Sequence, residues 1–142
     1  MKFESKKDIL FNSVMLGTLG LLIWIMAVVL TNGLSGETKY MALFFTLCLT
    51  GLLLWIYFGT SYSITNHTLS YRSGPIRGKI EIEKIKEIIK GKTLWVGLKP
   101  ATSTNGLIIK YGKYDEIYIS PKSNELFIKK LLALKSDIKV TE

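Results

Sequence analysis

Two uncharged apolar stretches decide the fold of this 142-residue chain: MLGTLGLLIWIMAVVL at residues 15–30 and YMALFFTLCLTGLLLWIYF at residues 40–58. Neither contains Asp, Glu, Lys or Arg. Together with the residues that flank it, each stretch is about 20 residues long. An α-helix that rises about 1.5 Å per residue needs about this length to cross ~30 Å of hydrocarbon. The sequence therefore predicts a transmembrane hairpin in residues 1–59, with spans at about 10–31 and 40–58, and a second domain in residues 60–142.

Basic residues flank this hairpin at its two outer ends. Those before the first span and within about 20 residues after the second are Lys2, Lys6, Lys7, Arg72, Arg77 and Lys79. The connecting loop, residues 32–39, contains a single lysine. Because basic residues accumulate on the cytoplasmic side of membrane proteins, we expect a multi-pass protein of the cell membrane with both termini in the cytoplasm.

Small residues follow one face of the first span. They are Ser13, Gly17, Gly20, Ala27 and Thr31. Small side chains let helix backbones approach closely, so we expect this face to pack on the second span near Thr46, Thr50 and Gly51. A contact between two copies of the chain is the alternative, which leaves a homo-oligomer open. Neither span has an ionisable residue at mid-depth, and this argues against an ion or proton pathway.

After the second span the hydrophobic pattern changes to period two, which is typical of strands. Alternating apolar residues predict strands at residues 62–64, 69–71, 79–82, 107–111 and 117–119. The first two strands should form a hairpin around the polar turn at residues 65–68. The spacing in residues 85–90 fits a helical turn or a strand. Residues 90–105 contain Gly, Pro, Ser and Thr in a pattern typical of a long loop.

The C-terminal segment has the signals of one amphipathic helix. Ser120 is a plausible N-cap, and Pro121 suits the first helical position because its missing N–H has no partner there anyway. Phe127, Leu131 and Leu134 recur at helical spacing and give one apolar face. A small antiparallel sheet buries such a helix against itself. The predicted class is therefore α+β: a small barrel-like antiparallel β domain with one C-terminal α-helix, preceded by the transmembrane hairpin.

Several segments of this domain resemble, in order, the YyaB-like family of bacterial pleckstrin-homology-like (PH-like) proteins. They are SGPIRGKIEIEKIKEI (73–88), KPA (99–101), LIIKYG (107–112) and ISPKSNELF (119–127). The resemblance covers about residues 58–134, and a membrane hairpin in front of the domain also matches it. It implies a PH-like fold for residues 60–142. The loop ATSTNG at residues 101–106 departs from the family pattern, so the resemblance assigns it no role.

The sequence contains no recognisable catalytic or metal-binding pattern. His67 is the only histidine and falls in a predicted turn, while Cys48 is the only cysteine and falls in the second span, so the chain has no His/Cys cluster. Ser120 has no histidine partner that would make it a nucleophile. The glycines form no phosphate-binding loop. We therefore expect a protein that is not an enzyme and needs no cofactor.

Net charge is concentrated in the C-terminal domain. Residues 60–142 contain 15 Lys and Arg against 8 Asp and Glu, which accounts for +7 of the total charge of +8. These basic residues are scattered among acidic ones, and no nucleic-acid-binding signature is present, so we expect no nucleic-acid partner. A basic domain held beside a bilayer is expected to interact with anionic membrane lipids.

The candidate binding residues are Arg72, Arg77 and Lys79, near the Gly74-Pro75 turn, and Trp95 in a basic loop. The three basic residues could face lipid phosphates or only set the topology. Trp95 could enter the membrane interface, anchor a peptide or pack in the core. The sequence favours a membrane-anchored interaction module at the inner leaflet that binds a protein or an anionic lipid. The alternative is self-immunity against an antimicrobial peptide, which some small membrane-tethered bacterial proteins with similar domains confer.

Overall fold

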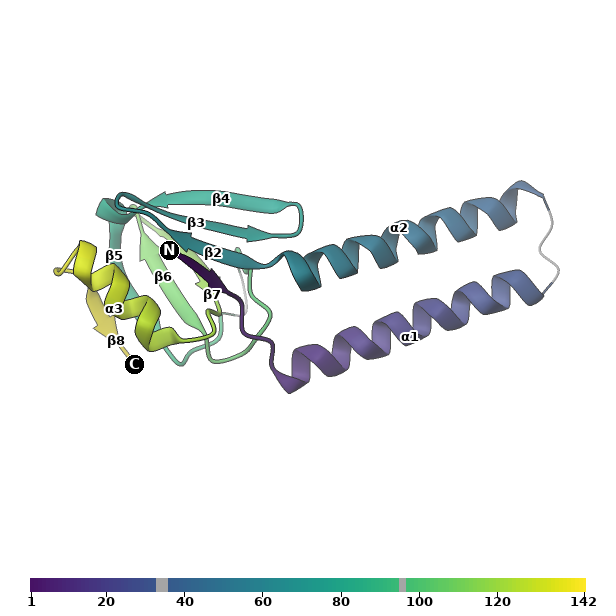
Figure 1. The fold of residues 1–142 in the computed structure, drawn as a ribbon, viewed down its shortest axis with the longest axis horizontal. Helices are drawn as coiled ribbons and strands as arrows, with labels where there is room; N and C mark the ends of the chain where they lie inside the picture. Colours follow the sequence, from purple (N-terminus) through teal and green to yellow (C-terminus); the bar gives the residue numbers. More distant parts are fainter. Residues whose placement is uncertain (33–35, 95–96) are drawn as a thin grey trace.

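The computed structural model describes residues 1–32, 36–94 and 97–142, and it consists of a helical hairpin and a strand-rich domain (Figure 1). The hairpin is formed by α1 (Ile9–Thr31) and α2 (Glu37–Gly59), which extend side by side away from the domain. Each helix has 23 residues, or about 35 Å at 1.5 Å per residue. Both helices are long and apolar enough to cross a membrane.

The two helices meet through a different face of α1 from the one that the sequence predicts. The buried side chains of α1 recur every seven residues, at Met15, Leu22 and Val29. The small-residue face points away, and no atom of α2 lies within 4 Å of the position that a Cβ would occupy on Gly17 or Gly20. A seven-residue repeat keeps large side chains on one seam between two helices. The predicted packing of the small-residue face is therefore wrong, although Thr46 of α2 is buried as expected.

The first sheet contains four antiparallel strands in the order β1-β2-β3-β4. They are β1 (Lys2–Glu4), β2 (Ser61–Ile64), β3 (Thr68–Ser73) and β4 (Ile76–Glu81). Strands β2 and β3 form the hairpin predicted from the period-two pattern, with Ile64 opposite Leu69. These apolar side chains are buried on the inner face of the sheet, and the polar residues between them point outward.

Strand β1 is an element that the sequence pattern does not predict. Residues in front of α1 pair with the strand that follows α2, and Phe3 lies opposite Tyr62. Phe3 is buried, and its ring meets the ring of Phe127 edge-on at a centroid distance of 5.0 Å. The chain thus leaves the domain through α1 and returns through α2 into the neighbouring strand (Figure 1). One sheet therefore holds both ends of the hairpin.

The second sheet has the order β7-β6-β5-β8. It contains β5 (Ile85–Lys90), β6 (Leu107–Tyr111), β7 (Asp115–Ile119) and β8 (Lys139–Thr141), and the 3-10 turn η1 (Ile82–Lys84) connects it to β4. Residues 85–90, whose spacing fits either a helical turn or a strand, form the strand β5. The strands β6 and β8 bond its backbone from both sides. Strands β6 and β7 form the second predicted hairpin. The parallel strand β8 is not predicted, since three residues carry too short a pattern.

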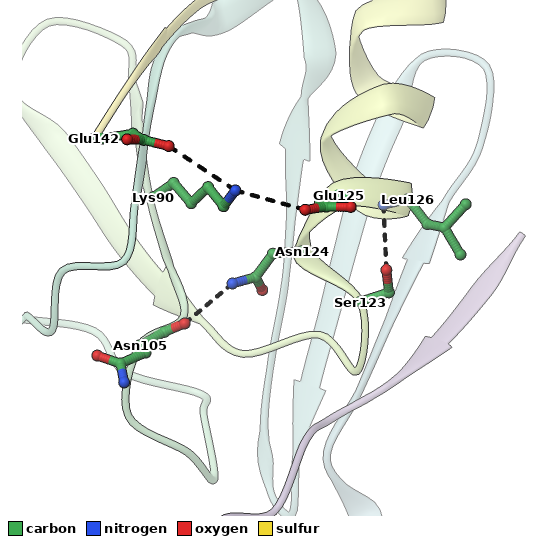
Figure 2. Close-up of polar contacts among 7 residues, drawn as sticks. All are labelled: Lys90, Asn105, Ser123, Asn124, Glu125, Leu126 and Glu142. Carbon is green, nitrogen blue, oxygen red and sulfur yellow. Dashed lines mark hydrogen bonds and ion pairs between the residues drawn. The ribbon is translucent and has the colours of Figure 1, made fainter.

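Helix α3 (Asn124–Leu134) begins later than the sequence predicts. Its N-cap is Ser123, whose Oγ accepts a hydrogen bond from the Leu126 N–H at 3.3 Å (Figure 2). The predicted cap, Ser120, is buried instead, and Pro121 forms an isolated bridge with Ser5. This bridge and the hydrogen bond from the Lys122 N–H to the Glu4 carbonyl, at 3.0 Å, hold residues 121 and 122 against the N-terminal segment. The chain can therefore turn into a helix only at the second serine.

Side-chain contacts from distant segments fasten the start of α3 (Figure 2). The Asn124 amide donates to the carbonyl of Asn105 at 3.0 Å. Lys90, at the end of β5, lies 3.8 Å from the Glu125 carboxylate and 4.0 Å from that of Glu142. These long ion pairs are exposed and contribute little stability. The position of α3 therefore depends mainly on its apolar face.

Side chains from both sheets and α3 form one hydrophobic core. Phe127 and Leu131 of α3 are fully buried in it, and Leu134 packs against its margin. The buried members from the strands and from η1 are Phe3, Tyr62, Ile64, Leu69, Ile80, Ile82, Ile85, Ile88, Leu107, Ile109, Ile117 and Ile119. The arrangement confirms the predicted α+β class with one C-terminal helix packed on the strands.

Candidate functional site

The polar face of the first sheet carries basic side chains in two cross-strand rows. The row nearer the helices consists of Glu4, Ser61, Arg72 and Arg77. The next row consists of Lys2, Ser63, Ser70 and Lys79. Because alternate residues of a strand point to opposite faces, all of these side chains share the face that points away from the core. We call this surface the outer face.

The structure brings three of the four predicted site residues together on the outer face. Arg72 and Arg77 are direct cross-strand partners, and Lys79 follows in the next row. All three are exposed. Like charges directly opposite each other on paired strands repel, so an anion between the two arginines would relieve this repulsion. Guanidinium groups also bind phosphate and carboxylate oxygens with paired N–H donors. The fourth candidate, Trp95, lies outside the described residues.

The Gly74-Pro75 turn places this charge next to the helical hairpin. Gly74 has a φ of 56°, a conformation that favours glycine. A Cβ at this position would lie 2.7 Å from Cγ1 of Ile56, so the turn packs directly on α2. The hydroxyl groups of Thr60 and Ser73 lie 2.9 Å apart at the same junction. The row nearer the helices is therefore fixed beside the last turn of α2.

A groove of about 740 Å³ opens where the outer face meets the ends of the helices. We call it the basic groove. It is lined by Lys2, Glu4, Ser5, Lys6, Lys7, Phe58, Gly59, Thr60, Ser61, Arg72 and Lys122. Five of these side chains are basic and one is acidic, so the formal net charge of the lining is +4.

The acidic residue of the groove is already paired. The Glu4 carboxylate accepts a hydrogen bond from the Lys122 ammonium at 2.5 Å. This hydrogen bond lowers the pKa of Glu4 below its ordinary value, so the carboxylate stays ionised at neutral pH. Within the part of the chain that the structure describes, the other four basic side chains of the groove form no ion pair. Their charge is available to an anionic ligand.

Lys7 occupies the corner of the basic groove that is closest to α2. Its Nζ lies 3.9 Å from the centroid of the Tyr57 ring and 5.0 Å from that of Phe58. The Tyr57 ring also stacks on Phe11, with ring centroids 6.0 Å apart. Cation–π contacts at exposed sites contribute about 0.5–1 kcal/mol. They hold the Lys7 ammonium at the level where the helices leave the domain.

A network of buried hydroxyl groups attaches the segment after β1 to the domain. Ser5 Oγ lies 3.0 Å from Tyr62 Oη and 3.0 Å from Ser120 Oγ. Thr102 Oγ1 donates to Ser5 Oγ at 2.8 Å, and Tyr62 Oη donates to the Pro100 carbonyl at 2.6 Å. Burial raises the pKa of Tyr62, so its hydroxyl remains a donor. The loop that departs from the family pattern thus anchors the N-terminal segment.

Asp8 fastens the start of α1 to the same loop. Its carboxylate accepts a hydrogen bond from the Phe11 N–H at 2.8 Å, which caps the helix. It also accepts hydrogen bonds from the N–H and the hydroxyl of Thr104, both at 2.7 Å. The Thr104 N–H lowers the pKa of Asp8, so the carboxylate is ionised at neutral pH. This clamp and strand β1 together position the lysines that lie between them.

The sequence did not reveal the lysines at 2, 6, 7 and 122 as members of one site. The first three look like topology signals until β1 pairs with β2 and brings them to the groove. The alternation Lys2-Phe3-Glu4 is a strand signal, but three residues are too few for a reliable assignment. Lys122 reaches the groove because its N–H bonds the Glu4 carbonyl at 3.0 Å.

The geometry of this site is suited to noncovalent binding of anions. Lysine and arginine supply charged donors, and the serines of the outer face add neutral ones that recognise phosphate or carboxylate oxygens. Within the described ranges, no group of three or more His, Cys, Asp or Glu residues could hold a metal ion.

The domain has two small sheets that share one core and carry a single C-terminal helix. Its basic outer face lies beside a helical hairpin, and this arrangement is PH-like. A family model described as "Bacterial PH domain" matches residues 60–135, and the chain belongs to this family. It is 33% identical over 91 residues to the uncharacterized protein YyaB of Bacillus subtilis (strain 168). These residues make up 63% of this chain and 62% of that relative. No solved structure is a significant match. The predicted resemblance to a YyaB-like PH-like family is confirmed.

Proposed function

We propose that this protein is a non-enzymatic, membrane-anchored PH-like module whose basic groove binds anionic lipid head groups at the cytoplasmic leaflet of the bacterial membrane. The observation that carries the proposal is the position of the groove. A cavity with a lining charge of +4 opens where two helices of membrane-spanning length enter the domain. If these helices cross a bilayer, the groove lies at the level of the lipid head groups.

The connection between the hairpin and the domain supports this arrangement. Because β1 pairs with β2, both ends of the hairpin must lie on the same side of a membrane that it crosses. Basic residues at both ends favour the cytoplasmic side. Each basic residue near an anionic surface contributes up to about 1 kcal/mol of attraction. The basic residues of the groove would together produce a substantial preference for anionic lipids.

The proposed topology predicts which positions a membrane-impermeant maleimide can reach in intact cells. In a Cys48→Ser background, Asn32→Cys should react because residue 32 would be extracellular. Tyr114→Cys, at a side chain that is 88% exposed in the domain, should react only after the cells are lysed. Labelling of Tyr114→Cys in intact cells, with Asn32→Cys protected, would mean that the orientation is inverted.

The proposed function predicts that anionic lipids accumulate around the full-length protein. Patches excised with a styrene–maleic acid copolymer from vesicles of phosphatidylcholine and phosphatidylglycerol should be richer in phosphatidylglycerol than the bulk, as counted by mass spectrometry. Replacing Lys6, Lys7 and Arg72, which all line the basic groove, with alanine should reduce this enrichment. Raising the salt concentration from about 0.1 M to about 1 M should reduce it too, because the screening length falls from ~10 Å to ~3 Å.

The matched control replaces three basic residues far from the groove. Lys129, Lys130 and Lys139 are exposed and suit this purpose. Lys135 does not, since its ammonium donates to two backbone carbonyls at 2.8 and 2.9 Å. Equal loss of enrichment in both triple variants would mean that only net charge matters. No enrichment in the unmodified protein would refute lipid binding and direct the search to protein ligands, of which an antimicrobial peptide would be one.

A further inference from the structure

A second cavity, of about 330 Å³, lies between α1 and α2 next to the domain. Most of its wall is aliphatic and includes Leu16 and Leu19 of α1 and Leu54 of α2. Leu16 and Leu54 are 71% and 39% exposed, so the cavity opens toward the space that lipid would occupy around the hairpin. Its chemistry fits a hydrocarbon chain.

The two cavities adjoin each other at one side chain. Phe58 lines both the basic groove and the apolar cavity. The Lys7 ammonium stands over the rings of Tyr57 and Phe58, both of which line the apolar cavity. A ligand that occupies both cavities would therefore pass Lys7 at the point where its polar part ends and its apolar part begins.

A neutral polar pair lies at this boundary. Tyr57 Oη donates to Asn12 Oδ1 at 3.0 Å, one helical turn inside α1. Within the described residues, Asn12 Nδ2 has no hydrogen-bond partner and remains free to donate. Along the path from the groove into the hairpin, the lining thus changes from cations to an amide donor and then to leucines. Phosphate, ester carbonyl and acyl chain follow one another in the same order along a glycerophospholipid.

We propose that the two cavities form one site for a single anionic glycerophospholipid, with its phosphate in the basic groove and one acyl chain between α1 and α2. This inference rests on the proposed function and narrows it from a charged surface to a defined lipid site. Charge complementarity selects an anionic head group. The adjoining apolar cavity selects a ligand that carries a hydrocarbon chain over a free phosphate or a soluble anion.

Native mass spectrometry of the full-length protein in detergent micelles tests this proposal, with dioleoyl phosphatidylglycerol as the probe. We expect one retained lipid per chain, and we expect soluble glycerol phosphate not to displace it. Leu19→Trp fills the apolar cavity and should lower the fraction of chains that retain the lipid severalfold relative to the control, because the indole ring takes the space of the acyl chain. Leu21→Trp is the matched control, because Leu21 is on the same helix, 55% exposed and outside the cavity.

The same variants separate the failure of this inference from the failure of the proposed function. If Leu19→Trp binds as tightly as the control while the excised patches stay rich in phosphatidylglycerol, surface charge alone attracts the lipid and the defined site is refuted. Displacement by glycerol phosphate would identify a site for free phosphate and would also refute it. Retention of phosphatidylcholine to the same extent as phosphatidylglycerol would show that the bound molecule is ordinary surrounding lipid, and it would refute a site that selects anionic lipids. Loss of both enrichment and retention would overturn the two proposals together.

Discussion

Truncation of Phe3 to alanine is expected to lower the free energy of unfolding of the C-terminal domain by about 3 to 5 kcal/mol, the range found for buried aromatic side chains. Phe3 precedes the helical hairpin in the sequence, yet it is only 9% exposed and belongs to the core. Its edge-on contact with Phe127, at 5.0 Å, would be lost together with the buried ring. The change would also loosen β1 and, with it, one side of the basic groove.

Unfolding of the full-length protein by denaturant in detergent micelles measures this effect. Circular dichroism and hydrogen exchange of the β2 and β6 amides serve to detect the unfolding. Lys2→Ala is the control, because Lys2 is exposed on the same strand and surface substitutions usually change stability by less than about 0.5 kcal/mol. A loss for Phe3→Ala no greater than that of the control would mean that β1 is not part of the domain in solution.

Replacement of Leu131 by alanine should destabilise the domain by about 2 to 5 kcal/mol, because it leaves a cavity under α3. Leu131 is fully buried between the helix and the strands, whereas the ion pairs at the start of α3 are long and exposed. The apolar face should therefore supply most of the energy that holds the helix in place.

The helix offers its own control for this measurement. Leu126→Ala removes the same side chain from an exposed position, 59% accessible, in the first turn of α3. It should cost less than about 0.5 kcal/mol. Unfolding of both variants in denaturant, monitored by circular dichroism, gives the comparison. A loss below about 0.5 kcal/mol for Leu131→Ala would show that α3 does not depend on this contact.

Features that depend on neighbouring residues could be predicted from the sequence. The hairpins β2–β3 and β6–β7 follow from alternating side chains on either side of a polar turn, and both are present. The helical spans follow from length and from the absence of charge. The start of α3 could not be chosen correctly, because Ser120 and Ser123 are both acceptable caps. A bridge between Pro121 and Ser5 decides between them.

The candidate site was predictable only in part, because some of its residues come together only through contacts between distant segments. Arg72, Arg77 and Lys79 lie close together in the sequence, and the β3–β4 hairpin places them on one face. The remaining basic groups come from the N-terminal segment and from the residue that follows Pro121. No local pattern connects these segments. The apolar cavity was also hidden, since it depends on which face of α1 meets α2.

By itself, the sequence determined the two apolar spans, the strand pattern behind them, the family and the excess of positive charge. Each of these properties is local or additive, so it can be read along the chain. Only the tertiary structure decided that Phe3 pairs with Tyr62, that large residues rather than glycines join the helices, and that N-terminal lysines meet Arg72 in one groove. These features depend on contacts between residues far apart in the sequence. Such contacts are selected by the packing of the whole domain, in which any one segment has several acceptable partners.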